Sequence, residues 1–506
     1  MKGAIFLILV QAITKGFTFV SNQLLLRSIT PEVFGVAAYF EFIVKSVLFF
    51  SREAERMSVQ RINEDNPQDT HRAVVNFAYL PFLLSWPVLG LVHAMQRSSD
   101  IYTSTICSLP NFQWLLAILV LLVEIELLAE PFYSLSQFDV NLKLKSKAES
   151  LAVFMKCIVT FVAILFISSL SKSKVTPVMA FALGHLAYSS TFYFVYWRNN
   201  NKGYPTISTL RSGTYLNQKV LPIWRSFSLQ MILKHLLTGG DTLIVSYFFS
   251  ASELGAYSVI SNYGSLLARL LFQPIEETLH VSMAKMFSGK DKNYKESYAS
   301  MKALTIFYSN LCSLVVLGGY SNGSFMLFTV LGSSSTWQKS DVFSVFPYYI
   351  LYIPFMAANG IFEGFFSSVS THQQIGRFSM FMSLLSIAVS TLLYVLIGKL
   401  HMGIIGLIIS NIANMVLRIT YCLLFMRLFY KDKVNVNLWE LMKRLLFPIV
   451  LALTAYAAQY TIIGGLMTST LKEFLISLAL CCLSLFGNLW NERALIKSLL
   501  SPNLKE

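Results

Sequence analysis

Long apolar runs separated by short polar connections dominate the chain. A membrane-spanning helix needs about 20 predominantly apolar residues. Fourteen segments meet this requirement, at residues 4–26, 33–50, 73–93, 114–135, 148–170, 177–196, 226–249, 253–274, 301–320, 342–366, 378–398, 403–426, 445–464 and 473–490. The pattern predicts an all-α polytopic membrane protein of about 14 transmembrane helices. The first run continues past Lys15 to Leu26 without a small-residue cleavage site, so we expect a mature span rather than a signal peptide.

The loops between these segments differ in their content of basic residues. When successive loops are assigned alternately to the two sides of the membrane, 25 loop Lys and Arg residues fall on the side of the N-terminus and 7 fall on the other side. Cytosolic loops of membrane proteins are enriched in these residues. We therefore predict that both termini are cytosolic.

Composition agrees with a membrane protein. The chain has 506 residues, 55% of them hydrophobic and 13% charged, and a mean hydropathy of +0.58, whereas soluble domains carry about 25% charged residues. The net charge of +14 does not indicate nucleic-acid binding, because the basic residues are spread over many loops rather than gathered on one surface. The six cysteines show neither metal-ligand spacing nor the density of a disulfide scaffold.

Two stretches about 220 residues apart share a layout. SITPEVFGVAAY (28–39) and SASELGAYS (250–258) each open a span and pair an acidic residue with a glycine, Glu32 with Gly35 and Glu253 with Gly255. The motifs SREAE and QPIEE then close these two spans at their predicted cytosolic ends. The repeat predicts two six-helix lobes in the same orientation, which is typical of transporters. The predicted regions are an N-terminal lobe at 1–200, a cytosolic linker at 201–225, a C-terminal lobe at 226–430, and two additional helices with a cytosolic tail at 431–506.

Charged residues also occur inside the predicted spans, where they usually have a partner or a function. Glu41 precedes Lys45 by four residues, so the two can pair on one helix face. Lys234 and Asp241 are seven residues, or two turns, apart. A neutral structural bridge is an equal alternative for each pair. Other charged residues within the spans are Glu124, Glu126, Glu130, Glu363 and Arg418.

Together the intramembrane cations predict a cavity suited to an anion, with phosphate or diphosphate as the natural candidate. The cations that we expect to bind substrate there are Lys15, Lys45, Lys156 and Lys234. Pro131 and Pro274, near the ends of spans four and eight, are expected to loosen their helices and to permit bending during alternating access.

Catalytic sequence motifs are missing. The sequence has no P-loop, no G-x-S-x-G, no H-E-x-x-H and no D-x-D cluster. The seven histidines are scattered, and we expect His185 and His235 to be satisfied helix residues rather than ligands. We predict no catalytic residue, no metal site and no cofactor, and therefore a protein that is not an enzyme.

Several stretches, in order from span one to span twelve, resemble the Rft family of endoplasmic-reticulum membrane proteins. They are TFVSNQLLLRSITPEVFGV (18–36), LFFSREAERMS (48–58), LAEPFYSLSQ (128–137), KAESLAVFMK (147–156), NYGSLLARLLFQPIEE (262–277), AANGIFEGFF (357–366) and NIANMVLRI (411–419). That family belongs to the multidrug, oligosaccharidyl-lipid and polysaccharide exporter superfamily, whose members share two six-helix lobes. The resemblance implies a multi-pass protein of the endoplasmic reticulum. Its implied role in N-glycosylation is to move a dolichol-diphosphate heptasaccharide of five mannoses and two N-acetylglucosamines from the cytosolic to the lumenal leaflet.

The resemblance also suggests a role for the charged motifs. By position, the matching residues are Arg52, Glu53 and Arg56 at the end of span two, and Arg269, Gln273, Glu276 and Glu277 at the corresponding site of span eight. Our hypothesis is that opposite charges on the two lobes lock the cytosolic gate when the lumenal side opens. Family members often have arginine in span one where this chain has Lys15, which keeps the charge but loses the bidentate fork.

Two other functions remain open. One is a non-transporting accessory factor that binds the dolichol-linked oligosaccharide or proteins of the glycosylation pathway, which are candidate partners. The other is an ion-coupled small-molecule exporter of the MATE type, from which the SREAxR and QPIEE pair would distinguish this chain.

Overall fold

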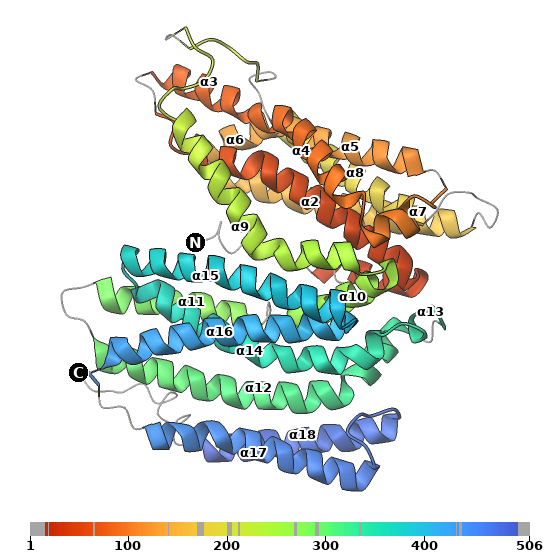
Figure 1. Ribbon diagram of the computed structural model, residues 1–506, viewed down its shortest axis with the longest axis vertical. Helices are drawn as coiled ribbons and strands as arrows, with labels where there is room; N and C mark the ends of the chain where they lie inside the picture. The colour runs from red at the N-terminus through yellow and green to blue at the C-terminus, as the bar shows by residue number, and fades with distance from the viewer. Residues whose placement is uncertain are drawn as a thin grey trace. The chain divides into compact units, whose positions relative to one another are not determined.

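A computed structural model of the chain describes residues 16–18, 20–63, 66–110, 112–139, 141–169, 177–199, 205–210, 213–267, 271–288, 293–332, 335–431, 433–434 and 438–493. Within these ranges the backbone forms helices joined by turns and contains no strand (Figure 1). The predicted all-helical architecture is therefore confirmed.

Eleven helices in the described ranges are long and apolar enough to cross a membrane. They coincide with eleven of the fourteen predicted spans. The other three predicted spans, 4–26, 226–249 and 253–274, each include residues whose positions or side chains lie outside the described part of the chain. The total of about fourteen spans therefore stays a prediction.

The chain divides into two compact units, Met1–Gly255 and Ala256–Glu506. In the first unit α7 packs along α8, α5 also packs on α8, and α2 packs against α4 and α9. The helices of this unit are α2 (Pro31–Val59), α3 (Pro67–Ala78), α4 (Leu80–Gln96), the π-helix η1 (Ile101–Ile106), α5 (Phe112–Leu128), α6 (Glu130–Phe138), α7 (Leu142–Ser169), α8 (Val178–Arg198), α9 (Leu221–Phe248) and the first turn of α10 (Ala251–Leu267).

Local sequence sets the ends of several of these helices. Thr30 caps α2, because its Oγ1 accepts a hydrogen bond from the backbone N–H of Val33 at 3.3 Å, and Pro31 follows as the first helical residue. The span predicted at 114–135 is interrupted where α5 ends at Leu128 and α6 begins at Glu130. Pro131, which lacks an N–H, stands in the first turn of α6. The interruption lies where the sequence predicted that Pro131 loosens the helix.

In the second unit α12, α14 and α16 pack in succession, α11 packs on α14, and α15 packs on α16 (Figure 1). The remaining helices are α11 (Gln273–Ser288), α12 (Tyr294–Leu331), α13 (Ser335–Gln338), α14 (Val342–Val369), α15 (His372–Leu393), the π-helix η3 (Tyr394–Lys399), α16 (Gly403–Tyr430), α17 (Leu438–Ile463) and α18 (Leu471–Asn491). α10 is described to Leu267 and α11 from Gln273, and residues 268–270 lie outside the described part of the chain, so the loosening predicted from Pro274 stays a prediction.

The last two helices, α17 and α18, are joined to α12 by a buried polar network. Asn322 on α12 donates from Nδ2 to Ser477 Oγ on α18 at 2.9 Å, and Ser477 Oγ donates to Gln459 Oε1 on α17 at 3.0 Å. Gln459 Nε2 in turn donates to the carbonyl of Leu466 at 2.7 Å. The helices that lack a counterpart in the sequence repeat are thus anchored in the second unit.

The two glycines of the sequence repeat lie against each other in the first unit. A Cβ placed on Gly35 would collide with the carbonyl oxygen of Ala251, and a Cβ placed on Gly255 would collide with the carbonyl oxygen of Pro31. Gly35 and Gly255 are 220 positions apart, and so are Pro31 and Ala251, so the contact is reciprocal between repeat-related residues. Reciprocal contacts of this kind are expected where a two-fold axis passes between matching segments.

Candidate functional site

The C-terminal half of α2 carries two arginines that meet two glutamates. Arg52 Nη1 lies 2.7 Å from Glu126 Oε1 and 3.2 Å from Glu130 Oε1. Arg56 binds Glu130 with two nitrogens, Nε to Oε2 at 3.0 Å and Nη2 to Oε1 at 2.5 Å. We call these four residues the arginine–glutamate cluster. Bidentate arginine–carboxylate contacts are among the strongest hydrogen-bonded pairs in proteins.

Burial raises the free-energy cost of separating the charges of this cluster. The side chain of Glu130 is 0% exposed and lies between both guanidinium groups. The Arg56 guanidinium also stacks over the ring of Tyr133, with its carbon 3.9 Å from the ring centroid, and Ser189 on α8 donates to Glu126 Oε2 at 3.2 Å. Four helices, α2, α5, α6 and α8, are therefore joined by one set of charges.

All four residues stood out in the sequence, but no arginine of this cluster was predicted to pair with either glutamate. A signal for the match was present, because the arginines are four residues apart on one helix and the glutamates are four apart in span four. Equal spacing places both pairs on single helix faces, where they can meet in register. Glu53, the third residue matched to SREAxR, has a longer contact, 3.9 Å from Glu53 Oε1 to Arg56 Nη1.

A second group of charges lies nearer the middle of α2. Glu41 Oε1 is 2.7 Å from Lys45 Nζ, so the pair expected from the spacing of four residues forms. Glu41 Oε2 is 3.5 Å from Lys156 Nζ on α7 and 3.7 Å from His185 Nε2 on α8. We call Glu41, Lys45, Lys156 and His185 the lysine cluster. The structure thus brings together two of the four predicted cavity cations.

The lysine cluster carries more positive than negative charge. One carboxylate faces two ammonium groups, so a net positive charge remains when His185 is neutral. The Lys45 side chain is 72% exposed, whereas that of Lys156 is 26% exposed. The protein therefore leaves most of the Lys45 side chain uncovered. His185 was not predicted at this site, because nothing near it in the sequence indicates a carboxylate from another helix.

In the second unit Glu363 and Arg418 form an ion pair between α14 and α16. Arg418 Nη2 lies 2.5 Å from Glu363 Oε2, and Asn359 Nδ2 donates to the same oxygen at 2.9 Å. The side chains of Glu363 and Arg418 are 28% and 19% exposed. Both residues were predicted as intramembrane polar positions, and the structure joins them to each other.

The QPIEE motif forms the first turn of α11. Gln273 Nε2 donates to Glu277 Oε1 at 3.1 Å, an exposed contact within the helix. The carboxylate of Glu276 lies directly over Gly360 of α14, where a Cβ would collide with Glu276 Oε1. The motif is thus more open than the arginine–glutamate cluster at the matching place in the first unit.

Four predicted site residues have positions or side chains outside the described part of the chain. Lys15 and Arg269 lie outside the described residues. Lys234 and Asp241 belong to α9, but their side chains lie outside the described part of the chain. The predicted roles of these four residues stay predictions.

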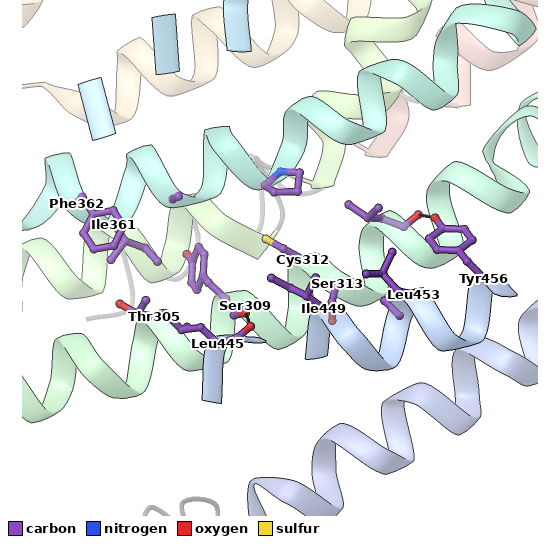
Figure 2. A pocket seen from close by; sticks show the side chains of 15 residues that line it. Thr305, Ser309, Cys312, Ser313, Ile361, Phe362, Leu445, Ile449, Leu453 and Tyr456 are labelled. Atoms are coloured by element: carbon purple, nitrogen blue, oxygen red, sulfur yellow. Dashed lines mark hydrogen bonds between the residues drawn. The ribbon is translucent and has the colours of Figure 1, made fainter. Parts of the chain in front are cut away.

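An apolar cavity of about 460 Å³ lies between α12, α14 and α17 (Figure 2). Hydroxyl groups along its wall are bonded to backbone carbonyls, since Ser309 Oγ donates to Leu445 O at 3.1 Å and Tyr456 OH donates to Val316 O at 2.8 Å. These groups therefore offer little hydrogen-bonding capacity to a ligand. Apolar cavities in proteins stay dry and accept hydrocarbon.

The fold is similar to that of known membrane transporters. The chain matches a structure of the lipid II flippase MurJ in an inward closed conformation, with a TM-score of 0.65 at 14% identity, covering 97% of this chain and 100% of that one. It also matches an inward-facing multidrug resistance MATE family transporter of the MOP superfamily, with a TM-score of 0.57 at 13% identity, covering 85% of this chain and 100% of that one. The chain therefore belongs to the fold class of these two structures.

Within this class the sequence identifies the family. The model of the Rft protein family matches residues 1–501, and the chain belongs to this family. A relative from Candida albicans, the Man(5)GlcNAc(2)-PP-dolichol translocation protein RFT1, is 35% identical over 505 residues, covering 94% of this chain and 90% of the relative. The protein of the same name from Saccharomyces cerevisiae is 38% identical over 486 residues, covering 85% and 83%. The family resemblance read from the sequence is confirmed.

Proposed function

We propose that this chain is a flippase-type translocation protein for dolichol-diphosphate-linked Man5GlcNAc2, and that it moves this lipid from the cytosolic to the lumenal leaflet of the endoplasmic reticulum. The relatives from Candida albicans and Saccharomyces cerevisiae are named for translocation of this lipid. The role is in protein N-glycosylation and includes no catalytic step. Proteins of the glycosylation pathway are candidate partners.

The lysine cluster is the observation in this structure that carries the proposal. A diphosphate linkage is a compact anion, and a lysine ammonium is a point charge that binds phosphate well. Lys45 and Lys156 come from different helices and converge on one point, with one carboxylate between them. An excess cation within an apolar span is expensive unless an anion arrives to neutralise it.

The apolar cavity between α12, α14 and α17 supports the same proposal. A dolichol lipid has a long hydrocarbon chain that makes no hydrogen bonds, so its binding surface has to be apolar. The cavity wall has this character, with Cys312, Ile361, Phe362 and Leu453 among its lining residues. We assign the isoprenoid chain of the lipid to this cavity.

The finer architecture belongs to the proposal as well. We propose fourteen spans, two six-helix lobes related by an axis along the membrane normal, two additional C-terminal helices, and cytosolic termini. The reciprocal contact of Gly35 and Gly255 supports the axis, and the excess of basic residues in alternate loops supports the orientation. Closure of the cytosolic gate by the SREAxR and QPIEE motifs is part of the same proposal.

Transport across a sealed bilayer tests the function. The purified protein is reconstituted into sealed vesicles, and the crossing of labelled dolichol-diphosphate heptasaccharide is followed with and without an ion gradient. The test variant is the double change Lys45→Ala and Lys156→Ala. The matched control is Lys295→Ala with Lys472→Ala, which removes two exposed lysines of the second unit.

We expect crossing to depend on the protein, to fall at least about tenfold in the lysine-cluster variant because two charge-assisted contacts are lost, and to be unchanged in the control. Equal rates in the two double variants would remove the lysine cluster from the mechanism. Absence of crossing under any gradient, together with accumulation of the intermediate in cells that lack the protein, would instead favour the accessory role. Transport of small cations in place of the glycolipid would favour the exporter role.

A further inference from the structure

The carboxylate of Glu41 occupies the place in the lysine cluster that an anionic ligand needs. It contacts Lys45 Nζ at 2.7 Å with one oxygen and lies 3.5 Å from Lys156 Nζ with the other. A carboxylate and a phosphate both bind ammonium groups through negatively charged oxygens. We propose that Glu41 is an internal competitor for the diphosphate, which holds the lysines in the empty state and speeds release of the lipid. This inference rests on the proposed function and deepens it.

A structural ion pair is the simpler interpretation of the Glu41–Lys45 contact, and two observations oppose it. A structural cluster balances its charges, as the arginine–glutamate cluster does with two carboxylates for two arginines, whereas Glu41 alone lies against Lys45 and Lys156 from two helices. A structural pair is also expected to be shielded, whereas the side chains of Lys45 and Glu41 are 72% and 37% exposed. An accessible pair with excess positive charge is arranged for exchange with an incoming anion.

His185, the third partner of Glu41 in the lysine cluster, explains where the carboxylate lies after an anion displaces it. His185 Nε2 lies 3.7 Å from Glu41 Oε2, and the His185 side chain is 15% exposed. When the lysines turn to a diphosphate, the imidazole remains against Glu41 and can donate a hydrogen bond to it through Nε2. His185 thus acts as a positioning residue, and the carboxylate has a polar neighbour in both states.

Competition of this kind suits a transporter. A site that binds its cargo very tightly releases it slowly, so passage requires binding strong enough for entry and weak enough for exit. A tethered carboxylate lowers the affinity for the anion by the free energy of the contacts that the anion has to replace. The same carboxylate then returns to the lysines as the anion leaves.

Binding of inorganic diphosphate to the purified full-length protein tests the inference. Titration calorimetry in magnesium-free buffer of low ionic strength compares the wild type with Glu41→Gln, Lys45→Ala and Glu32→Gln. Glu32 is the matched control, because it is an exposed carboxylate on the same helix in its first turn. We expect Glu41→Gln to bind diphosphate about fivefold more tightly, the size of one partly exposed charge contact. Lys45→Ala should bind more weakly, and Glu32→Gln should match the wild type.

The outcomes separate this inference from the proposed function. If Lys45→Ala binds as the wild type does, the anion site itself is wrong. If Lys45→Ala weakens binding but Glu41→Gln fails to tighten it, the anion site stands and Glu41 is a structural pair, which overturns the inference. In vesicles, Glu41→Gln should also lower the crossing rate at saturating lipid, because release becomes slower.

A second variant covers the case in which Glu41→Gln fails to fold. Glu41→Asp keeps the charge but withdraws the carboxylate by one methylene from Lys156 and His185. We expect tighter diphosphate binding than in the wild type, by less than the fivefold change for Glu41→Gln. Unchanged or weaker binding in a monodisperse Glu41→Asp protein would also overturn the inference.

Discussion

The SREAE motif at the end of α2 and the QPIEE motif at the start of α11 hold matching places in the sequence repeat, but their surroundings differ. Arg52 and Arg56 are committed to Glu130, a carboxylate with no exposed surface. Glu277 has an exposed contact with Gln273 in its own helix. Charges that are buried and paired within one unit are expensive to separate, so they hold helices together. Exposed charges keep their partners loosely and remain available for a changing contact.

The largest effect that this comparison predicts is at Glu130. Glu130→Ala leaves the guanidinium groups of Arg52 and Arg56, which are 17% and 14% exposed, without a shared carboxylate, which should cost about 3–5 kcal/mol and remove most of the folded protein. Yield and thermal unfolding in detergent measure the loss. Lys295→Ala, at an exposed position in the first turn of α12, is the control and should stay within about 0.5 kcal/mol. If the two variants unfold alike, the arginine–glutamate cluster does not stabilise the first unit.

The next effect is at the ion pair of the second unit. Arg418→Met leaves Glu363 with the amide of Asn359, and the expected loss of stability is about 1.5–3 kcal/mol, as for a hydrogen bond between charged groups. The double variant Arg418→Met with Glu363→Gln should recover part of this loss, because neither charge is then left unpaired. Thermal unfolding of the three proteins checks the cycle, and a double variant less stable than Arg418→Met would contradict it.

A smaller effect is expected from the aromatic side of the arginine–glutamate cluster. Tyr133→Leu removes the ring beneath Arg56 but leaves its salt bridge with Glu130, so we expect a loss of about 1–2 kcal/mol. Tyr133→Phe keeps the ring and should lie closer to the wild type. Equal unfolding temperatures for the leucine variant and the wild type would show that the cation–π contact contributes nothing measurable.

The smallest effect on stability is expected at Glu277, where the effect on transport should be clear. Glu277→Lys changes an exposed side chain and should alter stability by less than about 0.5 kcal/mol. Under the gate hypothesis the reversed charge impairs closure, so glycosylation of a reporter should fall in cells that depend on this variant. Normal glycosylation in these cells would show that Glu277 is not part of the gate. Loss of the folded protein would instead show that the QPIEE motif stabilises the fold, as the arginine–glutamate cluster is expected to do.

The helices could be predicted from the sequence because the signals for each helix lie in consecutive residues. Apolar runs of spanning length, Thr30 before Pro31, and the break near Pro131 are local signals. The Glu41–Lys45 contact is also local, since a spacing of four residues fixes it on one helix.

The partners across helices could not be predicted in the same way. Arg56 meets Glu130 only because α2 and α6 pack in one particular register, and nothing beside either residue specifies that register. His185 illustrates the same limit, because the carboxylate that it approaches comes from another helix. Spacing within one helix therefore predicts pairs of charged residues, whereas the packing of helices against one another determines which pairs form a cluster.

The reciprocal contact of Gly35 and Gly255 has a consequence for substitution along the chain. Positions 220 residues apart in a sequence ordinarily vary independently, because each has its own neighbours. Here the room for a side chain at Gly35 is filled by the backbone of Ala251, and the room at Gly255 is filled by the backbone of Pro31. Neither glycine can gain a side chain without a shift of the other segment's backbone, so we expect the two positions to tolerate substitution only together.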